Sequence, residues 1–169
     1  MFAFVTGCGL SSSGAEIVPS GLKRNRLSGY NWVVRPSGNG GPGPNHWDQD
    51  QAWVDDKGCL HRNLTQRNGV WYCSAVRMEG RLGFGQYQFW VVGGGDRLDK
   101  NIVFGMFTCP TSDVGPDGAH EIDIEFSRWS QADNPMGNYT AGPATTTVQR
   151  TARGFSLALD GDRSTHRFT

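Results

Sequence analysis

The sequence predicts an all-β fold, either a sandwich or a barrel of short strands. The chain has 169 residues, of which 24 are glycine and six are tryptophan, and glycine-rich turns between aromatic strands are typical of such folds. After residue 28, apolar runs follow one another with no helical period between them. A meander of this kind stacks into two sheets. With 37% hydrophobic residues, the chain can enclose one core.

The strands are expected in the following order. A turn at Asp56-Lys57-Gly58 precedes a β-run at 59–66, and Arg67-Asn68-Gly69 separates that run from another at 70–78. Asn-Gly between two β-runs is a strong hairpin signal. Further strands are expected at 84–92, 101–108 and 120–129, separated by the turn Gly93-Gly94-Gly95-Asp96 and by the segment 110–118.

The run at 120–129 carries three acids that alternate with apolar residues. Period two places Glu121, Asp123 and Glu125 on one face of a strand. Their like charges repel, so one carboxyl is expected to keep its proton near neutral pH. On the concave side of a curved sheet, two Glu side chains can bring their carboxyls to the roughly 5 to 5.5 Å of a retaining glycosidase. The residues expected to pack behind the acids are Ile122, Ile124 and Phe126.

A carboxyl separation of roughly 5 to 5.5 Å leaves no room for a water between the two groups, so it predicts a double displacement. One carboxylate attacks the sugar carbon, while the other protonates the leaving oxygen and then activates water. The alternatives are an acidic edge or solvent face of an ordinary sheet, or part of a calcium site.

The stretch Glu121-Ile122-Asp123-Ile124-Glu125 resembles the catalytic strand of glycoside hydrolase family 16. The resemblance spans residues 30 to 130. The upstream segments that resemble the preceding strands of that family are Gly41-Pro42-Gly43-Pro44-Asn45-His46-Trp47, Val54-Asp55-Asp56-Lys57-Gly58-Cys59-Leu60, Gly69-Val70-Trp71-Tyr72, Leu82-Gly83-Phe84-Gly85-Gln86-Tyr87-Gln88-Phe89 and Leu98-Asp99-Lys100-Asn101-Ile102-Val103-Phe104-Gly105-Met106-Phe107.

This resemblance implies a role for each acid. Glu121 would be the nucleophile, Asp123 the helper that hydrogen-bonds and tunes it, and Glu125 the acid/base. The strand has no extra residue before the last Glu, and this unbulged form resembles mixed-linkage glucanases (lichenases) and xyloglucan transglycosylases. The implied activity is that of a retaining endo-β-glucanase acting on β-1,3-1,4-glucan or related β-glucans. After Phe126, the chain reads Ser-Arg-Trp where Leu-Gly is common in the family.

The resemblance also implies a concanavalin-like β-sandwich, a jelly roll of two curved antiparallel sheets. Family domains continue with a Trp and several more strands beyond the position of Thr169, so the domain is expected to be incomplete at its C-terminus. For substrate contacts we expect Trp129, which regular alternation would keep on the face of Glu125. The other expected contacts are Asn45, Trp47 and Phe107.

The sequence at the N-terminus predicts a lipid anchor. Val5-Thr6-Gly7-Cys8 resembles a bacterial lipobox, in which the cysteine carries lipid, and Ser11-Ser12-Ser13-Gly14 is typical of a flexible tether. Residues 1–28 are thus expected to be a lipoprotein signal remnant and Ser/Gly-rich linker, and 29–169 a partial catalytic domain. A lipid anchor to the membrane and an extracellular or cell-surface location follow. Alternatively the lipobox match is accidental, since Met1 to Phe4 is too short for an apolar signal core.

The remaining composition excludes several functions. The formal net charge is zero and the basic cluster is Lys23-Arg24-Asn25-Arg26 alone, so nucleic acid binding is not expected. The histidines form no metal-binding pair, and no metal or other cofactor is expected. The three cysteines Cys59, Cys73 and Cys109 match no zinc pattern and are expected to be buried free thiols, although a bridge between Cys59 and Cys73 is geometrically open.

Three function classes remain open at this point. The first is the retaining endo-β-glucanase, with β-glucan as its partner and a monomeric chain. The second is a xyloglucan-type transglycosylase that uses the same acids but passes the glycosyl intermediate to a sugar acceptor. The third is a non-catalytic carbohydrate-binding sandwich or an inactive fragment.

Overall fold

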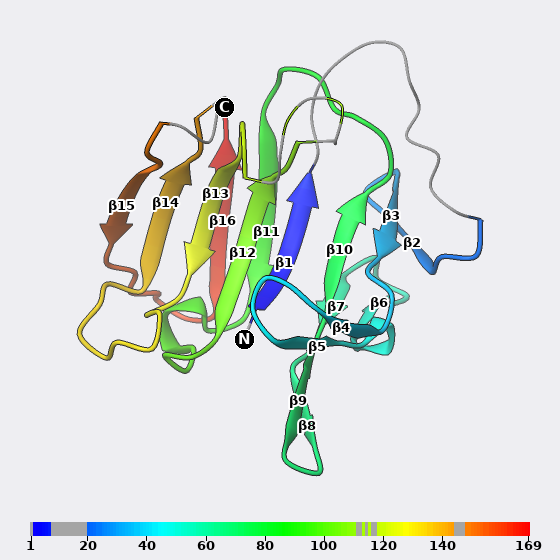
Figure 1. The fold of residues 1–169 in the computed structure, drawn as a ribbon, viewed down its shortest axis with the longest axis horizontal. Helices are drawn as coiled ribbons and strands as arrows, with labels where there is room; N and C mark the ends of the chain where they lie inside the picture. Colours follow the sequence, from blue (N-terminus) through cyan, green and yellow to red (C-terminus); the bar gives the residue numbers. More distant parts are fainter. Residues whose placement is uncertain (1, 8–19, 111–112, 114, 116–117, 144–147) are drawn as a thin grey trace.

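The computed structural model of the chain describes residues 2–7, 20–110, 113, 115, 118–143 and 148–169, with backbone only for 2–7. Within these residues the regular structure consists of β-strands and two short 3-10 helices, Gln49–Gln51 and Gly95–Arg97. The prediction of an all-β fold is confirmed. The strands form one large sheet, a two-stranded second layer and two small sheets (Figure 1).

The large sheet has eight strands in the order β15-β14-β13-β12-β1-β10-β3-β2. Its strands pair antiparallel except β1, which runs parallel to both of its neighbours, β10 and β12. The large sheet is thus antiparallel, as predicted, except at β1. The strands are β1 (Phe2–Gly7), β2 (Arg24–Leu27), β3 (Tyr30–Val34), β10 (Ala75–Met78), β12 (Val103–Thr108), β13 (Ile122–Phe126), β14 (Gly137–Ala141) and β15 (Thr151–Phe155).

Two of these strands lie in the segment predicted to precede the catalytic domain. β1 pairs along its whole length with β12, and β2 pairs residue by residue with β3. The sheet in this structure therefore begins before residue 29. The predicted lipid-attachment residue, Cys8, and the Ser/Gly tether at 11–14 lie outside the described residues.

The second layer consists of β11 (Tyr87–Val92) and β16 (Arg163–Phe168), which pair antiparallel. Apolar side chains of this pair, among them Phe89 and Phe168, pack against the buried core of the large sheet. The Phe126 ring of β13 meets the His166 ring of β16 with centroids 4.8 Å apart. The main core thus lies between the large sheet and the β11–β16 pair (Figure 1).

The small sheets confirm the predicted hairpin. β8 (Thr65–Arg67) and β9 (Val70–Cys73) pair antiparallel around Asn68 and Gly69, which have φ of 50° and 80°. Positive φ at both central residues is the backbone of a type I′ turn. The other strands are β4 (Gly38–Gly40) and β5 (Asn45–Trp47) in the same sheet, with β5 parallel to β9, and β6 (Ala52–Val54) paired with β7 (Leu60–Arg62).

Two predicted strands are split in the structure. The run 59–66 becomes β7 and β8, and the run 70–78 becomes β9 and β10. β9 belongs to a small sheet and β10 to the large one, so the chain changes sheets at Ser74. The buried Ser74 hydroxyl donates to the carbonyl of Gln51 at 3.1 Å, which satisfies its polar group at the crossing.

The cysteines depart in part from the prediction. Cys73 is a buried free thiol, as expected, whereas Cys59 is free but exposed, so its expected burial is wrong. Cys109, which directly follows β12, is disulfide-bonded, so the expectation of a free thiol is wrong for this residue. Within the part of the chain that the structure describes, no helix is long and apolar enough to cross a membrane.

Candidate active site

Strand β13 places two of the predicted acids on one face of the large sheet. Asp123 lies opposite Phe107 of β12, and Glu125 lies opposite Gly105. On the other side, β14 brings Thr140 opposite Asp123 and Asn138 opposite Glu125. The register is continuous, so the strand has no bulge before Glu125, as the sequence predicts. Directly opposed residues share a face, and we call the side that carries Asp123 and Glu125 the carboxylate face.

The residues behind the acids follow the prediction with one exception. Ile124 and Phe126 are buried in the main core. Ile122, however, is 48% exposed, so its predicted core position is wrong. Ile122 is the first residue of β13 and borders a cavity of about 330 Å³ that reaches Tyr139 and Phe168, so the second layer does not close over this end of the strand.

The three carboxyls interact with one another. Burial, and then the charges of Glu121 and Glu125, raise the pKa of Asp123 to about 8. A side-chain hydrogen bond joins Asp123 to Glu121, and it contributes to this increase. Two carboxyls share a hydrogen bond only when one of them carries a proton. The raised pKa of Asp123 makes it the carboxyl that carries this proton.

Glu125 also holds its proton more tightly than an ordinary glutamate. Burial raises its pKa to about 7, and the Glu121 charge acts in the same direction. A hydrogen bond from Asn138 opposes this change, and Asn138 Nδ2 also donates to Thr140 Oγ1 at 2.8 Å. The Glu121 charge is thus close enough to Glu125 to affect its titration. Glu121 itself precedes β13, which begins at Ile122, so the prediction that all three acids lie on the strand is wrong for Glu121.

Three side chains around the acids were not predicted from the sequence. Asn138 and Thr140 come from β14, and their alternation in Asn138-Tyr139-Thr140 is a period-two signal that could have placed both beside the acids. Arg150 lies just before β15, and its Nη2 is 3.4 Å from Glu121 Oε1. Its segment matches no motif, so only the fold brings it to the site.

Phe107 and Trp47 meet in a small apolar cluster next to the acids. The cluster consists of Trp47, Cys73 and Ala75, with Leu64 and Phe107 packed against it. Phe107 shares the face of Asp123, as a substrate contact would require. Trp47 is only 2% exposed, donates from Nε1 to the Gly40 carbonyl at 3.0 Å and has the Arg35 guanidinium 4.0 Å from its ring centroid. Its ring therefore supports the cluster and presents no open surface to a sugar.

Asn45 is also buried, and its amide nitrogen donates to the carbonyl of Pro42. Asn45 and Trp47 alternate on β5, and each side chain is hydrogen-bonded to the segment before the strand, Asn45 to Pro42 in the turn and Trp47 to Gly40 of β4. In this structure they shape the wall next to the cluster, and neither offers an open polar or aromatic group.

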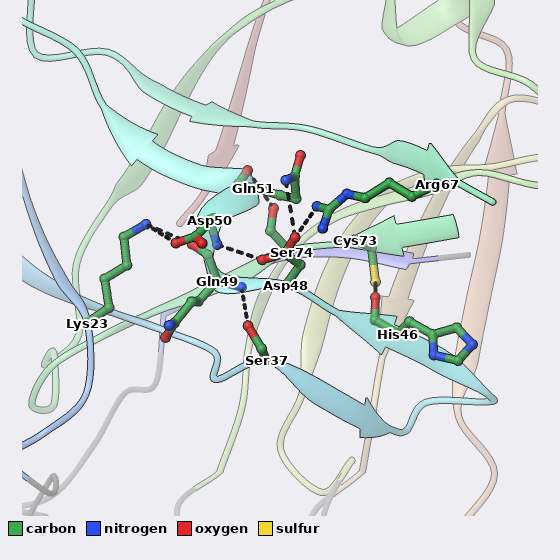
Figure 2. A network of polar contacts seen from close by, with 10 residues as sticks. All are labelled: Lys23, Ser37, His46, Asp48, Gln49, Asp50, Gln51, Arg67, Cys73 and Ser74. Carbon is green, nitrogen blue, oxygen red and sulfur yellow. Dashed lines mark hydrogen bonds and ion pairs between the residues drawn. The ribbon is translucent and has the colours of Figure 1, made fainter. Parts of the chain in front are cut away.

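Asp48 anchors the segment that follows Trp47 (Figure 2). Its carboxylate accepts hydrogen bonds from the Asp50 backbone N–H at 2.9 Å and from Gln51 Nε2 at 3.2 Å, and it pairs with Arg67 of the β8–β9 hairpin. Burial alone would raise the pKa of Asp48, but the hydrogen bonds from Asp50, Arg67 and Gln51 lower it. This ionised carboxylate ties β5 to the hairpin and fixes the wall that contains Trp47.

Trp129 does not continue strand β13, as its predicted position required. β13 ends at Phe126, and Trp129 lies in the following turn with φ of 50°. Regular alternation therefore does not reach it. Its ring is 43% exposed, and its backbone N–H donates to Ser127 Oγ at 3.0 Å. The backbone of this turn, and not the strand, therefore decides where the Trp129 side chain lies relative to the end of β13.

Among the described residues, no group of three or more His, Cys, Asp and Glu side chains could hold a metal ion. A second cavity, of about 260 Å³, lies between the loop after β13 and the segment after β15, where Arg128, Asn134 and Leu157 line it. Neither this cavity nor the one beside Ile122 contains Glu121 or Glu125 in its lining. Asp123 does line the cavity beside Ile122, and it is buried, as most of the Glu121 side chain is.

No protein-family model matches this chain, and no curated protein or solved structure is significantly similar to it. The resemblance to glycoside hydrolase family 16 therefore rests on the motifs quoted above.

Proposed function

We propose that this protein is a retaining, endo-acting glycoside hydrolase that cleaves β-1,3-1,4-glucan or a related β-glucan. One observation carries the proposal: Asp123 and Glu125 share one face of an unbulged strand, Glu121 precedes that strand and is hydrogen-bonded to Asp123, and the pKa of Glu125 is raised to about 7. A nucleophile and an acid with separated pKa values are the two groups that a double displacement needs.

In the first step, the Glu121 carboxylate attacks the anomeric carbon and forms a covalent ester with the sugar. The bond between the anomeric carbon and the glycosidic oxygen breaks, and Glu125 gives its proton to that oxygen. Asp123 stabilises Glu121 by its hydrogen bond before the attack. Because Glu125 is protonated up to about pH 7, it can act as the acid near neutral pH.

In the second step, the ionised Glu125 takes a proton from water, and the water oxygen attacks the anomeric carbon. The ester bond to Glu121 breaks, and Glu121 leaves as a carboxylate. The sugar keeps its original anomeric configuration. Asn138, which hydrogen-bonds Glu125, orients that carboxyl for both proton transfers.

A jelly roll, a β-glucan substrate and an extracellular location are parts of the same proposal. The absence of a bulge favours the lichenase and transglycosylase type of strand over the laminarinase type. The disulfide at Cys109 agrees with an oxidising compartment outside the cytosol.

The direct test is reducing-end release from mixed-linkage glucan, laminarin and xyloglucan by the 169-residue chain. Glu121→Gln is expected to abolish turnover while glucan binding remains, because the nucleophile is lost and the fold is kept. Glu125→Gln is expected to lose the native substrate but to retain cleavage of aryl glucosides with good leaving groups, which need no acid. Either variant cleaving native glucan at the parent rate would show that the assignment is wrong.

Product analysis separates the other classes. Transfer products in the presence of xyloglucan oligosaccharides, with little free reducing sugar, would identify a transglycosylase. A folded chain that binds glucan without cleaving it would identify a binding sandwich.

A further inference from the structure

Arg150 is a cation that reaches the carboxylates from outside β13. Its Nη2 lies 3.4 Å from Glu121 Oε1 and also donates to the Gly118 carbonyl at 3.4 Å. The Glu121 side chain is only 14% exposed, whereas that of Arg150 is 48% exposed. Shielding from water by itself disfavours an ionised carboxylate, whereas the Arg150 cation beside Glu121 favours the ionised form.

The fold leaves space for this contact at Gly118. A Cβ built at Gly118 would overlap the Arg150 guanidinium, and the backbone there has φ of 82°. Glycine is the residue that accepts both conditions. The backbone of Glu121 is held as well, because its carbonyl accepts from the Gly142 N–H at 2.6 Å. The Arg150 side chain therefore meets a Glu121 that is fixed in place.

The neighbouring strands offer Glu121 no competing charge. β12 and β14, which flank β13, contain no charged residue between Val103 and Thr108 or between Gly137 and Ala141. The acids Asp123 and Glu125 lie on β13 itself, and His120 precedes Glu121 as an exposed side chain. Arg153 of β15 is in register with Tyr139 and hence with Ile124, on the face opposite to the carboxylates.

We propose that Arg150 is a positioning residue that keeps Glu121 ionised and oriented as the nucleophile, and so sets the pH range of the reaction. The inference rests on the proposed function. The Arg150 charge also lowers the pKa of both Asp123 and Glu125, in opposition to their burial. Loss of Arg150 is therefore expected to move both limbs of the pH profile upward: the acid limb because Glu121 ionises later, and the alkaline limb because Glu125 keeps its proton longer.

The test compares the parent chain with Arg150→Gln, Arg150→Lys and Arg153→Gln. In Arg150→Gln, the acid limb of kcat/KM on mixed-linkage glucan is expected to rise by about one pH unit, as for a carboxylate that loses a neighbouring Arg. Arg150→Lys should stay close to the parent profile. Arg153→Gln removes a nearby arginine from the other face and should not shift the profile. Gly118→Ala should act like Arg150→Gln, since it displaces the guanidinium.

A lower kcat in Arg150→Gln with both limbs unmoved would overturn the inference while the proposed function stands. A second readout does not need activity: the chain has four glutamates, so the side-chain carboxyl carbons give few NMR signals, and Glu→Gln variants assign them. The Glu121 signal should titrate at higher pH in Arg150→Gln than in the parent. If the Glu121 signal titrates at the same pH in both proteins, the inference is overturned, whether or not the parent cleaves glucan. A parent chain that cleaves no glucan would by itself refute only the proposed function.

Discussion

The raised pKa of Glu125 predicts how protein stability depends on pH. The pKa of this carboxyl rises from 4.5 to about 7 on folding, chiefly because the group is buried. Between these values Glu125 holds a proton in the folded protein that it releases in the unfolded chain. The contribution of Glu125 to folding stability is therefore fully present below pH 4.5 and is lost as the pH rises through 7. At 1.36 kcal/mol per pH unit, the loss from Glu125 amounts to about 3 kcal/mol.

Glu125→Gln removes this dependence, because an amide has no proton to lose. The free energy of unfolding of the variant, minus that of the parent, is expected to increase by about 3 kcal/mol between pH 4.5 and pH 8. Urea unfolding of both proteins at pH 4.5, 6 and 8 measures this difference. Asp160→Asn makes the same change of acid to amide at an exposed position and serves as the control.

The measured quantity is the change in this difference with pH, so a constant effect of the amide on packing cancels. Asp123 keeps a raised pKa in the variant, because burial is the largest cause of that rise and the Glu125 charge a smaller one. A difference between parent and Glu125→Gln that stays constant from pH 4.5 to pH 8 would refute the reasoning, because it would mean that Glu125 titrates alike in the folded and unfolded chains.

Two further predictions concern the fold. Phe126→Ala empties the fully buried position behind the acids and is expected to cost about 3 to 5 kcal/mol in urea unfolding; a loss below about 1 kcal/mol would contradict the packing described for β13. Gly69→Ala places a side chain at φ of 80° in the hairpin turn and is expected to cost about 1 to 2 kcal/mol, whereas an unchanged midpoint of thermal unfolding would argue against a type I′ turn.

The local features of the fold could be read from the sequence. Asn68-Gly69 specifies its turn because both residues accept positive φ, and the flanking residues pair as expected. The strand ends could not be read in this way. The run 70–78 is continuous in its pattern, yet the chain passes from one sheet to another at Ser74. The parallel placement of β1 between β10 and β12 joins residues about a hundred positions apart, and no local pattern reports such a pairing.

The candidate site divides in the same way. The sequence by itself determined that Asp123 and Glu125 share a face with Ile124 and Phe126 behind them, because alternation along a strand is a property of the backbone. Only the tertiary structure decided what surrounds the acids. Register across β14 brings Asn138 to Glu125, the segment before β15 brings Arg150 to Glu121, and packing buries Trp47. A strand's period is local, whereas desolvation and charge depend on neighbours that only the folded chain brings together.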